Sequence, residues 1–356
     1  MAEMDAAILK KAEERTQNRF RYTDKDHIVI EELVRLCVSR EYAALSGEND
    51  AVYFAGPSKP EDNVIHLEQK DEPFDLAGKK IMLPSLPIIF TQIVSLMGNS
   101  NSSANDFAEV IRMDPPLAAR LLKLVNSSFY GLRHRVDTVS SAVSVVGTKA
   151  LYSLVLSMSV IKTFKDIPEN FVTLPSFWSH SIACGVIAKR IAEYKKIPET
   201  ERFFVAGLLH DIGRLVIFNY LPFRAKEAFE MSWENDEPLH QSEKKVLEHD
   251  HAKFGGLLLK FWKLSDILVD MVMFHHLPGR ARHRKEVSVI HFADIITNGM
   301  QIGSSGERFV PPLNFDAWKY IELPVQYFEK LFEIVGKEVS EVTRIITPSK
   351  NKPGKI

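Results

Sequence analysis

Apolar residues recur every three or four positions along most of the chain, which is the spacing that gives an α-helix one buried face. The pattern is densest from residue 83 to residue 300, where it predicts a series of helices. Residues 149–164 are apolar on nearly every side, as expected of a helix at the centre of a core. Two short stretches, 51–55 and 63–67, could be extended, but neither predicts a sheet. We therefore expect an all-α fold.

Residues that cap helices mark several of the predicted boundaries. Asp114 followed by Pro115 is typical of an N-cap and a first helical turn. Asp250 likewise predicts the start of a helix that runs to about Trp262. The segment 325–346 has amphipathic spacing, so we expect helices almost to the end of the chain.

Composition divides the chain into segments. With 356 residues and 45% apolar content, it is long enough for two lobes with a sizeable core. Residues 41–78 carry nine acidic and two basic side chains, interrupted by prolines, which is typical of an exposed connector. The predicted segments are an N-terminal helical segment (1–48), an acidic linker (49–80), a main domain (81–302), a C-terminal loop and helix (303–346) and a tail (347–356).

Charge and cysteine content narrow the class of protein. The formal net charge of −1 gives no overall attraction to nucleic acid or to an anionic membrane. The first thirty residues are polar, and no run reaches the roughly 18 apolar residues of a membrane span. We therefore expect a cytoplasmic protein that binds neither membrane nor a specific nucleic acid. The two cysteines, Cys37 and Cys184, fit buried apolar positions better than a disulfide.

The adjacent residues His210 and Asp211 are the first candidates for chemistry. They lie near the end of an apolar helix that begins at about Glu201, so two metal-binding side chains stand on a rigid support. We expect Gly207 to allow close approach of another backbone and Gly213 to stop the helix. A histidine-aspartate pair alone is more often a capped helix end than a pair of ligands. However, nine of the twelve histidines lie between residues 180 and 291, so the question is whether they converge.

Several successive helices each supply a further candidate ligand. Neutral imidazole and carboxylate together suit iron, manganese, nickel and zinc, provided that stiff elements hold them. Each residue alone could be a cap, a packed side chain or a surface residue. The seven candidates are His180, His210, Asp211, His251, His275, His276 and Asp294.

Motifs between residues 83 and 298 carry a resemblance to a known family. The run Leu-Pro-Ser-Leu-Pro at 83–87 is followed by Asp114-Pro115, by Asn126-Ser127 with Phe129 and Gly131, and by Ala142-Val143 and Gly147. In this order they resemble the HDOD domains of bacterial signalling proteins. The resemblance implies an all-helical bundle of the HD superfamily with two lobes, 81–165 and 166–302, after a short helical extension.

HDOD domains are related to the metal-dependent HD phosphohydrolases, and this relationship implies roles for the seven candidates. It puts Asp211 at the bridge between two transition-metal ions. It puts His180, His210 and Asp294 around one ion and His251, His275 and His276 around the other. The segment His-Ala-Lys-Phe-Gly at 251–255 resembles the corresponding segment of two-metal members.

A pair of bridged metals would support hydrolysis of a phosphoester by an activated water. We expect Asp211 and Arg214 to take part in catalysis, with Arg214 reaching a substrate phosphate. The basic loop 280–285 could hold the substrate or be a solvated turn. Relatives that hydrolyse cyclic di-GMP follow their histidine doublet with an acidic residue and Gly-Tyr-Pro, but this chain has Leu277-Pro-Gly-Arg. Cyclic di-GMP is therefore not the expected substrate, and Ser176 gives no support for a third metal.

Two functions remain open from the sequence. The first is a two-metal phosphohydrolase that acts on a nucleotide or another small molecule with a phosphate. The second is a signalling module without catalysis, in which the metal site is structural or regulatory. In that case we expect the lobe 83–164 to bind a protein partner or a second copy of the chain. Metal binding is common to both.

Overall fold

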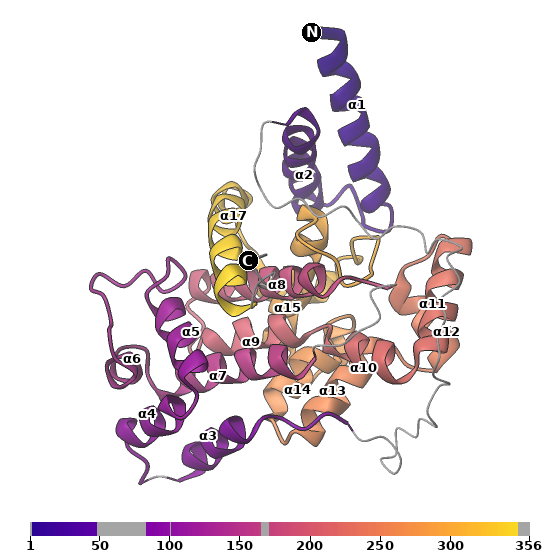
Figure 1. The fold of residues 1–356 in the computed structure, drawn as a ribbon. Coiled ribbons are helices and arrows are strands. Elements are labelled where there is room, and N and C mark those ends of the chain that lie inside the picture. The colour runs from indigo at the N-terminus through magenta and orange to yellow at the C-terminus, as the bar shows by residue number, and fades with distance from the viewer. Residues whose placement is uncertain (1, 48–82, 100, 165–170, 348–356) are drawn as a thin grey trace, which may run out of the picture. The chain divides into compact units, whose positions relative to one another are not determined.

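The computed structural model describes residues 2–47, 83–99, 101–164 and 171–347, and every regular element in these ranges is a helix (Figure 1). The predicted all-α class is confirmed. The predicted linker, the two stretches that could be extended and the tail from residue 348 lie outside the described residues. The chain forms two compact units, of which the first comprises residues 1–83 and 166–335 and the second comprises 84–165 and 336–356.

The second unit is built mainly from five helices between residues 88 and 163. Ser103 starts one of them with a capping box, and Asp114 caps the next by accepting a hydrogen bond from the backbone of Leu117, as predicted. The longest helix of this unit is buried almost all round from Leu151 to Ile161. The five helices are α3 (Ile88–Gly98), α4 (Ala104–Arg112), α5 (Pro115–Val125), α6 (Val139–Val146) and α7 (Thr148–Thr163).

The first unit contains the histidine-rich part of the chain and the N-terminal helices. Its helices are α1 (Ala2–Arg19), α2 (Ile28–Ser46), α8 (Leu174–Tyr194), α9 (Glu201–Leu209), α10 (Ile212–Tyr220), α11 (Pro222–Glu234), α12 (Leu239–Leu247), α13 (His251–Phe261), α14 (Asp266–Met273), the 3₁₀ turn η1 (Pro278–Arg280), α15 (Arg284–Met300) and α16 (Phe315–Ile321). The division between the two units falls within α17 (Tyr327–Ile346). Helix α8 packs against α9 and α15, and α13 packs against α10 and α14. These helices carry the candidate ligands, so their packing determines where those side chains meet.

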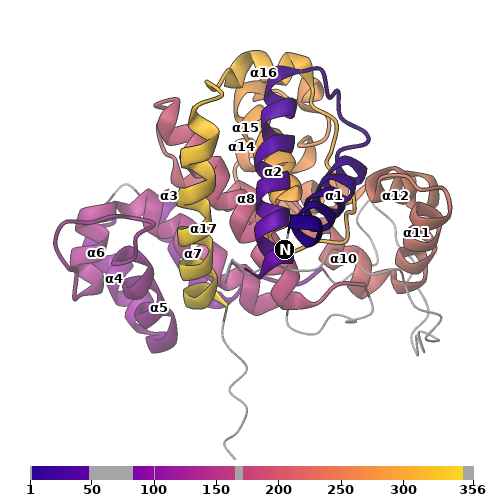
Figure 2. The ribbon, with the colours of Figure 1, turned by 90° about the horizontal axis from the view of Figure 1, so that it is seen from above.

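Helices α1 and α2 lie side by side and form a hairpin (Figure 2). Phe20, between them, is fully buried and lies so close to Gly299 of α15 that a side chain there would clash with it. Arg40 donates a hydrogen bond to the carbonyl of Met300, and the carbonyl of Arg19 accepts one from the backbone of Val310. The N-terminal segment is therefore an integral part of the first unit.

Helix α16 was not predicted from the sequence. It is only seven residues long, and Asn314 caps it by accepting a hydrogen bond from the backbone of Ala317. Its residue Ile321 is buried, and its residue Trp318 lies against Phe292 of α15. Such a short helix has too few turns to show a periodic pattern, and its stability comes from packing.

One stretch of the described chain, Glu201–Tyr220, is long and apolar enough to span a membrane by composition alone. In the structure, 89% of its apolar window is buried, which is the behaviour of a core segment. The bent pair formed by α6 and α7 passes the same test only if both helices are taken together. Neither is evidence for a membrane protein.

Candidate metal centre

His210 and Asp211 occupy a break between two helices. Helix α9 ends at Leu209 and α10 begins at Ile212, so the pair lies at the junction and both side chains are buried. The prediction that Gly213 stops the helix is wrong, because Gly213 lies inside α10. The tight turn comes instead from the two residues that carry the chemistry.

Glycines let neighbouring helices approach this junction from both sides. A Cβ atom on Gly207 of α9 would lie 2.5 Å from the Cα atom of Gly185 in α8. A Cβ atom on Gly213 would lie 2.0 Å from the carbonyl oxygen of His251 and 2.6 Å from the backbone nitrogen of Gly255 in α13. No side chain fits at such distances, so α9 touches α8 and α10 touches α13 through bare backbone. Asp211 is thereby held between the helices that bear His180 and His251.

The first ligand group consists of His180 on α8, His210 and Asp294 on α15. The Nε2 atoms of His180 and His210 lie 3.5 and 3.4 Å from Oδ1 of Asp294. They lie 3.5 and 3.2 Å from Oδ2 of Asp211. All four side chains are at most 5% exposed. Two imidazoles and two carboxylates thus converge on one point.

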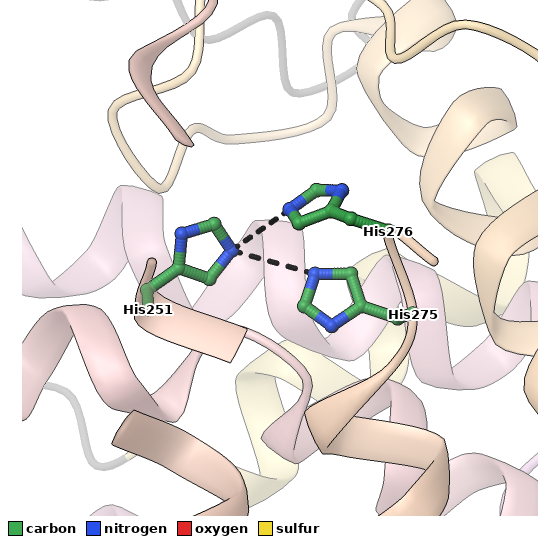
Figure 3. Close-up of side chains that lie close together, drawn as sticks. All are labelled: His251, His275 and His276. Atoms are coloured by element: carbon green, nitrogen blue, oxygen red, sulfur yellow. Dashed lines mark hydrogen bonds between the residues drawn. The ribbon is translucent and has the colours of Figure 1, made fainter. Parts of the chain in front are cut away.

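The second ligand group consists of His251, His275 and His276, whose Nε2 atoms point toward one another (Figure 3). The Nε2 atom of His251 lies 3.4 Å from that of His275 and 3.1 Å from that of His276. His251 begins α13, and the doublet follows the end of α14. His251 and His275 are fully buried, whereas His276 is partly exposed.

Asp211 faces both groups, one oxygen to each. Its Oδ2 atom is directed at the first group, and its Oδ1 atom lies 2.9 Å from Nε2 of His251 and 3.9 Å from Nε2 of His275. A carboxylate that offers its two oxygens to two different sets of donors is arranged as a bridge. The structure therefore brings all seven candidates together, in the two sets that the resemblance implied.

Hydrogen bonds at the far side of three rings fix which nitrogen carries the proton. Nδ1 of His210 lies 2.7 Å from the carbonyl oxygen of Gly207, and Nδ1 of His275 lies 2.7 Å from that of Val272. A carbonyl oxygen only accepts, so both Nδ1 atoms donate. In the neutral rings, Nε2 then presents a lone pair toward the centre. His251 is held in the same way, with its Nδ1 atom 2.5 Å from Glu243.

This arrangement of lone pairs fits metal ions. The Nε2 atoms of His180 and His210 are buried and have no hydrogen-bond partner within the described part of the chain. Buried nitrogens without a partner are costly, and the three Nε2 atoms of the second group converge on one point. Ligand atoms of His180, His210 and Asp211 lie within 4.8 Å of one another, as do those of the second group. A cation at each point would satisfy these groups, and the donor types suit a transition metal.

The charges in the centre support the same conclusion. Burial opposes ionisation of Asp211, but the positive charges of His210, Arg214 and His251 hold its pKa well below the usual value. Asp211 is therefore a carboxylate. Burial, with the charges of His210 and His251, lowers the pKa of His275 to about 3. That ring is consequently neutral and ready to bind a metal at neutral pH.

Arg214 does not have the position that we expected for a residue that reaches a substrate. Its side chain is 1% exposed. Its Nε atom donates to Glu243 at 3.1 Å, and its Nη1 atom donates to Ser305 at 2.7 Å. Because Glu243 also accepts from the backbone and the ring of His251, Arg214 supports that ligand through Glu243. The geometry favours a positioning role over contact with a phosphate.

His240 is a neighbour of the centre that sequence reasoning missed. Its ring stacks on that of His276 at 4.4 Å between centroids, and its Nδ1 atom lies 3.7 Å from Glu307. His240 is on α12 and Glu307 lies in the loop before α16, so no local spacing links either to the doublet. His291 is also buried, and its Nδ1 atom donates to the backbone carbonyl of His275.

The basic loop after the doublet is folded but exposed. The backbone nitrogens of Arg282 and His283 both donate to Asp270 at 3.1 Å, which fixes the course of the loop. Four basic side chains of this loop point to solvent: Arg280, Arg282, Arg284 and Lys285.

A sequence model of the HDOD domain matches residues 83–278, which is more than half of the chain. The chain belongs to the HDOD family. The HDOD match ends before Asp294, so one residue of the first ligand group lies beyond it. The N-terminal hairpin lies outside it as well.

Among curated proteins, an uncharacterized protein from Treponema pallidum (strain Nichols) is 26% identical over 219 residues. The similar region is 60% of this chain and 42% of that protein, so the chain spans less than half of this relative.

Solved structures share the HDOD fold. An HDOD domain protein of unknown function from Geobacter sulfurreducens has a TM-score of 0.63 and 23% identity, over 74% of this chain and 94% of that one. A proposed phosphohydrolase from Shewanella amazonensis has a TM-score of 0.60 and 25% identity, over 74% and 95%. A proposed signal transduction protein from Marinobacter aquaeolei has a TM-score of 0.59 and 21% identity, over 75% and 60%.

Proposed function

We propose that this HDOD protein holds two transition-metal ions and hydrolyses a phosphoester other than cyclic di-GMP. The observation that carries the proposal is the position of Asp211, which offers one carboxylate oxygen to each of the two ligand groups. The donors are five imidazoles and two carboxylates, a set that suits iron, manganese, nickel or zinc. The similarity to a proposed phosphohydrolase from Shewanella amazonensis supports the same reaction class.

In this reaction the residues of the chain would have the following roles. Bound divalent ions supply a water of lowered pKa and stabilise negative charge on a phosphoryl oxygen. Asp211 would be a ligand of both ions, while the carbonyl of Gly207 and that of Val272 orient His210 and His275. Arg214 and Glu243 fix the ring of His251 from behind. Three of the imidazoles are therefore held on their far side, which preorganises the centre.

We expect the phosphoester to approach from the side of His276, the only one of the seven that is partly exposed. The exposed basic side chains of the loop 280–285 follow this residue in the chain and provide charge for a phosphate. The chain lacks the acidic residue and the Gly-Tyr-Pro segment that accompany cyclic di-GMP in the resembling relatives. For this reason the proposal names a nucleotide or another small phosphoester.

Burial of the centre favours a second function. Six of the seven side chains are at most 5% exposed, and a closed metal site is typical of a structural role. In this alternative, the protein is a signalling module whose lobe 83–164 binds a partner or a second copy. Large apolar side chains on this lobe support such a contact, since Ile88 is 77% exposed and Met113 is 69% exposed.

The test of the first function is hydrolysis by protein with a known metal content. We would reconstitute the purified chain with manganese, iron or zinc, measure metal per chain, and assay mononucleotides, cyclic nucleotides and an aryl phosphate. The blank is Asp211→Asn, which removes charge from the bridge and keeps its size. Hydrolysis of a compound other than cyclic di-GMP, above the blank, supports the proposal. Activity confined to cyclic di-GMP contradicts the proposed choice of substrate. Metal-loaded protein that hydrolyses none of the compounds contradicts the enzyme and favours the signalling module.

The signalling module has a test of its own. Light scattering would compare the association state of the wild type with Ile88→Glu and Met113→Glu. The matched control is Ile28→Glu, because Ile28 is 64% exposed but belongs to the first unit. Loss of self-association in the first two variants alone supports the lobe as the contact. An equal change in the control would argue against it.

A further inference from the structure

The second unit contains a hollow of about 770 Å³, lined only by residues of that unit. Its walls are α5, the loop that follows α5, and the last turns of α17. None of the seven candidate ligands lines it. The volume is within the range of about 300–1,000 Å³ that is usual for sites that bind small molecules.

Side-chain hydrogen bonds preform the walls of this hollow. Asn126 donates to the carbonyl of Val136 at 2.7 Å and accepts from its backbone nitrogen at 2.8 Å, which ties the loop to the end of α5. Glu341 of α17 accepts from the backbone nitrogen of Ser128 at 3.1 Å and from its hydroxyl at 2.5 Å. The loop is therefore fixed to both helices, and a ligand would not have to order it.

Positive charge in the hollow exceeds negative charge. Its lining includes Arg120 and Lys123 of α5, Arg135 of the loop and Arg344 of α17, against two carboxylates. Asp137 is paired with Arg135 at 3.0 Å, and Glu341 is engaged by Ser128. Within the described ranges, Arg120, Lys123 and Arg344 have no carboxylate within 4.0 Å. Three cations from two helices that line the hollow are thus available to an anion.

Apolar side chains complete the lining. Leu122, Leu132, Val136 and Ile345 contribute carbon surface between the cationic groups. A small inorganic anion would pair with the cationic groups but would leave this apolar surface exposed to water. A molecule that joins several phosphate oxygens to a planar ring would use both, because arginine binds phosphate and also stacks on ring faces.

We propose that this hollow is a binding site for a nucleotide-like ligand that carries at least two phosphate groups. The site is separate from the metal centre and independent of the hydrolysis proposed above. Its occupancy would give the second unit an effector, whether or not the metal centre is catalytic. Phosphates pair with Arg120, Lys123 and Arg344, and the ring covers the apolar surface near Leu132 and Val136.

The experiment is calorimetric titration of the full chain with ATP, GTP, pyrophosphate and a glutamate-rich peptide. A metal chelator in every solution removes metal-dependent binding at the other site. The variants are Lys123→Glu and Arg344→Glu, which reverse one charge on α5 and one on α17. The matched control is Arg112→Glu, because Arg112 is an exposed residue of the same unit that does not line the hollow. Thermal unfolding of each variant checks that it is folded.

We expect ATP or GTP to bind the wild type, and each of the two wall variants to bind at least about tenfold more weakly, which corresponds to about 1.4 kcal/mol. Arg112→Glu should stay within about twofold of the wild type, since it changes no charge in the lining. Absence of nucleotide binding, or equal loss in Arg112→Glu, overturns the proposal. So does equal affinity for pyrophosphate, which would show that the ring is not recognised. Binding of the acidic peptide alone would assign the hollow to a protein partner instead.

Because these titrations exclude metal, they leave the hydrolysis proposal untouched. A failure of the proposal for the hollow can thereby be distinguished from a failure of the proposal for the metal centre.

Discussion

The two ligand groups differ in charge and in exposure. The first group, His180, His210 and Asp294, is fully buried and shares Asp211, so two carboxylates face its centre. The second group, His251, His275 and His276, has three imidazoles and the other oxygen of Asp211. A divalent cation is neutralised better in the first group, because it meets more negative charge there. The second group is the one with a partly exposed ligand.

The supports of the two groups also differ. Asp294 is held within its own helix, since Asn298 donates to its Oδ1 atom at 2.7 Å. His251 is held by Glu243 and Arg214, which come from two other helices. From this comparison we predict that the first group binds a metal ion more tightly than the second. Four variants or pairs of variants break or sharpen it.

The largest effect is expected from Asp211→Ala, because this side chain serves both groups. We expect metal content after reconstitution to fall from about two ions to well below one per chain, since both sites lose a negative ligand. Elemental analysis measures it. The matched control is Asp236→Ala, an aspartate that is not one of the seven candidate ligands and whose side chain is 50% exposed. Retention of one full equivalent in Asp211→Ala would show that the carboxylate is no bridge.

Gly213→Ala should damage the second group through the backbone. The new methyl group would lie 2.0 Å from the carbonyl oxygen of His251, so α10 and α13 must separate. Overpacking of this kind costs about 1–3 kcal/mol or more, and it displaces His251. Thermal unfolding and metal content measure the two consequences. Gly279→Ala is the control, since nothing lies within 4 Å of its added Cβ atom; equal destabilisation by both changes would refute the clash.

Replacement of single histidines should separate the groups. We expect His276→Ala to lose about one ion and to keep the tighter one, because it leaves the first group intact. His180→Ala should lose the tighter ion instead. Competition with a coloured chelator distinguishes the two, because the ion that remains is released at different chelator concentrations. Identical release curves for the two variants would mean that the groups do not differ in affinity.

The smallest effects are expected from the supporting residues. Glu243→Gln should weaken the second site by about 10–100-fold, and Asn298→Ala should weaken the first by a similar factor or less, as is usual for residues behind metal ligands. Metal titration of each variant measures both sites. If Glu243→Gln weakened the first site instead, the contact of Glu243 with His251 would not support metal binding by the second group.

The sequence by itself determined the helices and the identity of the candidate ligands. Periodic apolar positions and caps such as Asp114 and Asp250 are local signals, so they were readable without a structure. The order of the seven candidate ligands was readable as well, because the resemblance links order to role. The break between α9 and α10 was not, since the alternative of a helix that continues to Gly213 satisfies the same pattern.

Only the tertiary structure decided what surrounds those ligands. Glu243, His240 and Glu307 lie on other elements than His251 and His276, and no periodic spacing predicts that they meet. The environment of Arg214 was also not predictable. From the sequence we expected it to reach a substrate phosphate, but in the fold it is buried among carboxylates. Local patterns encode which face of a helix is buried. They do not encode which distant side chain lies behind it, because that depends on how helices pack.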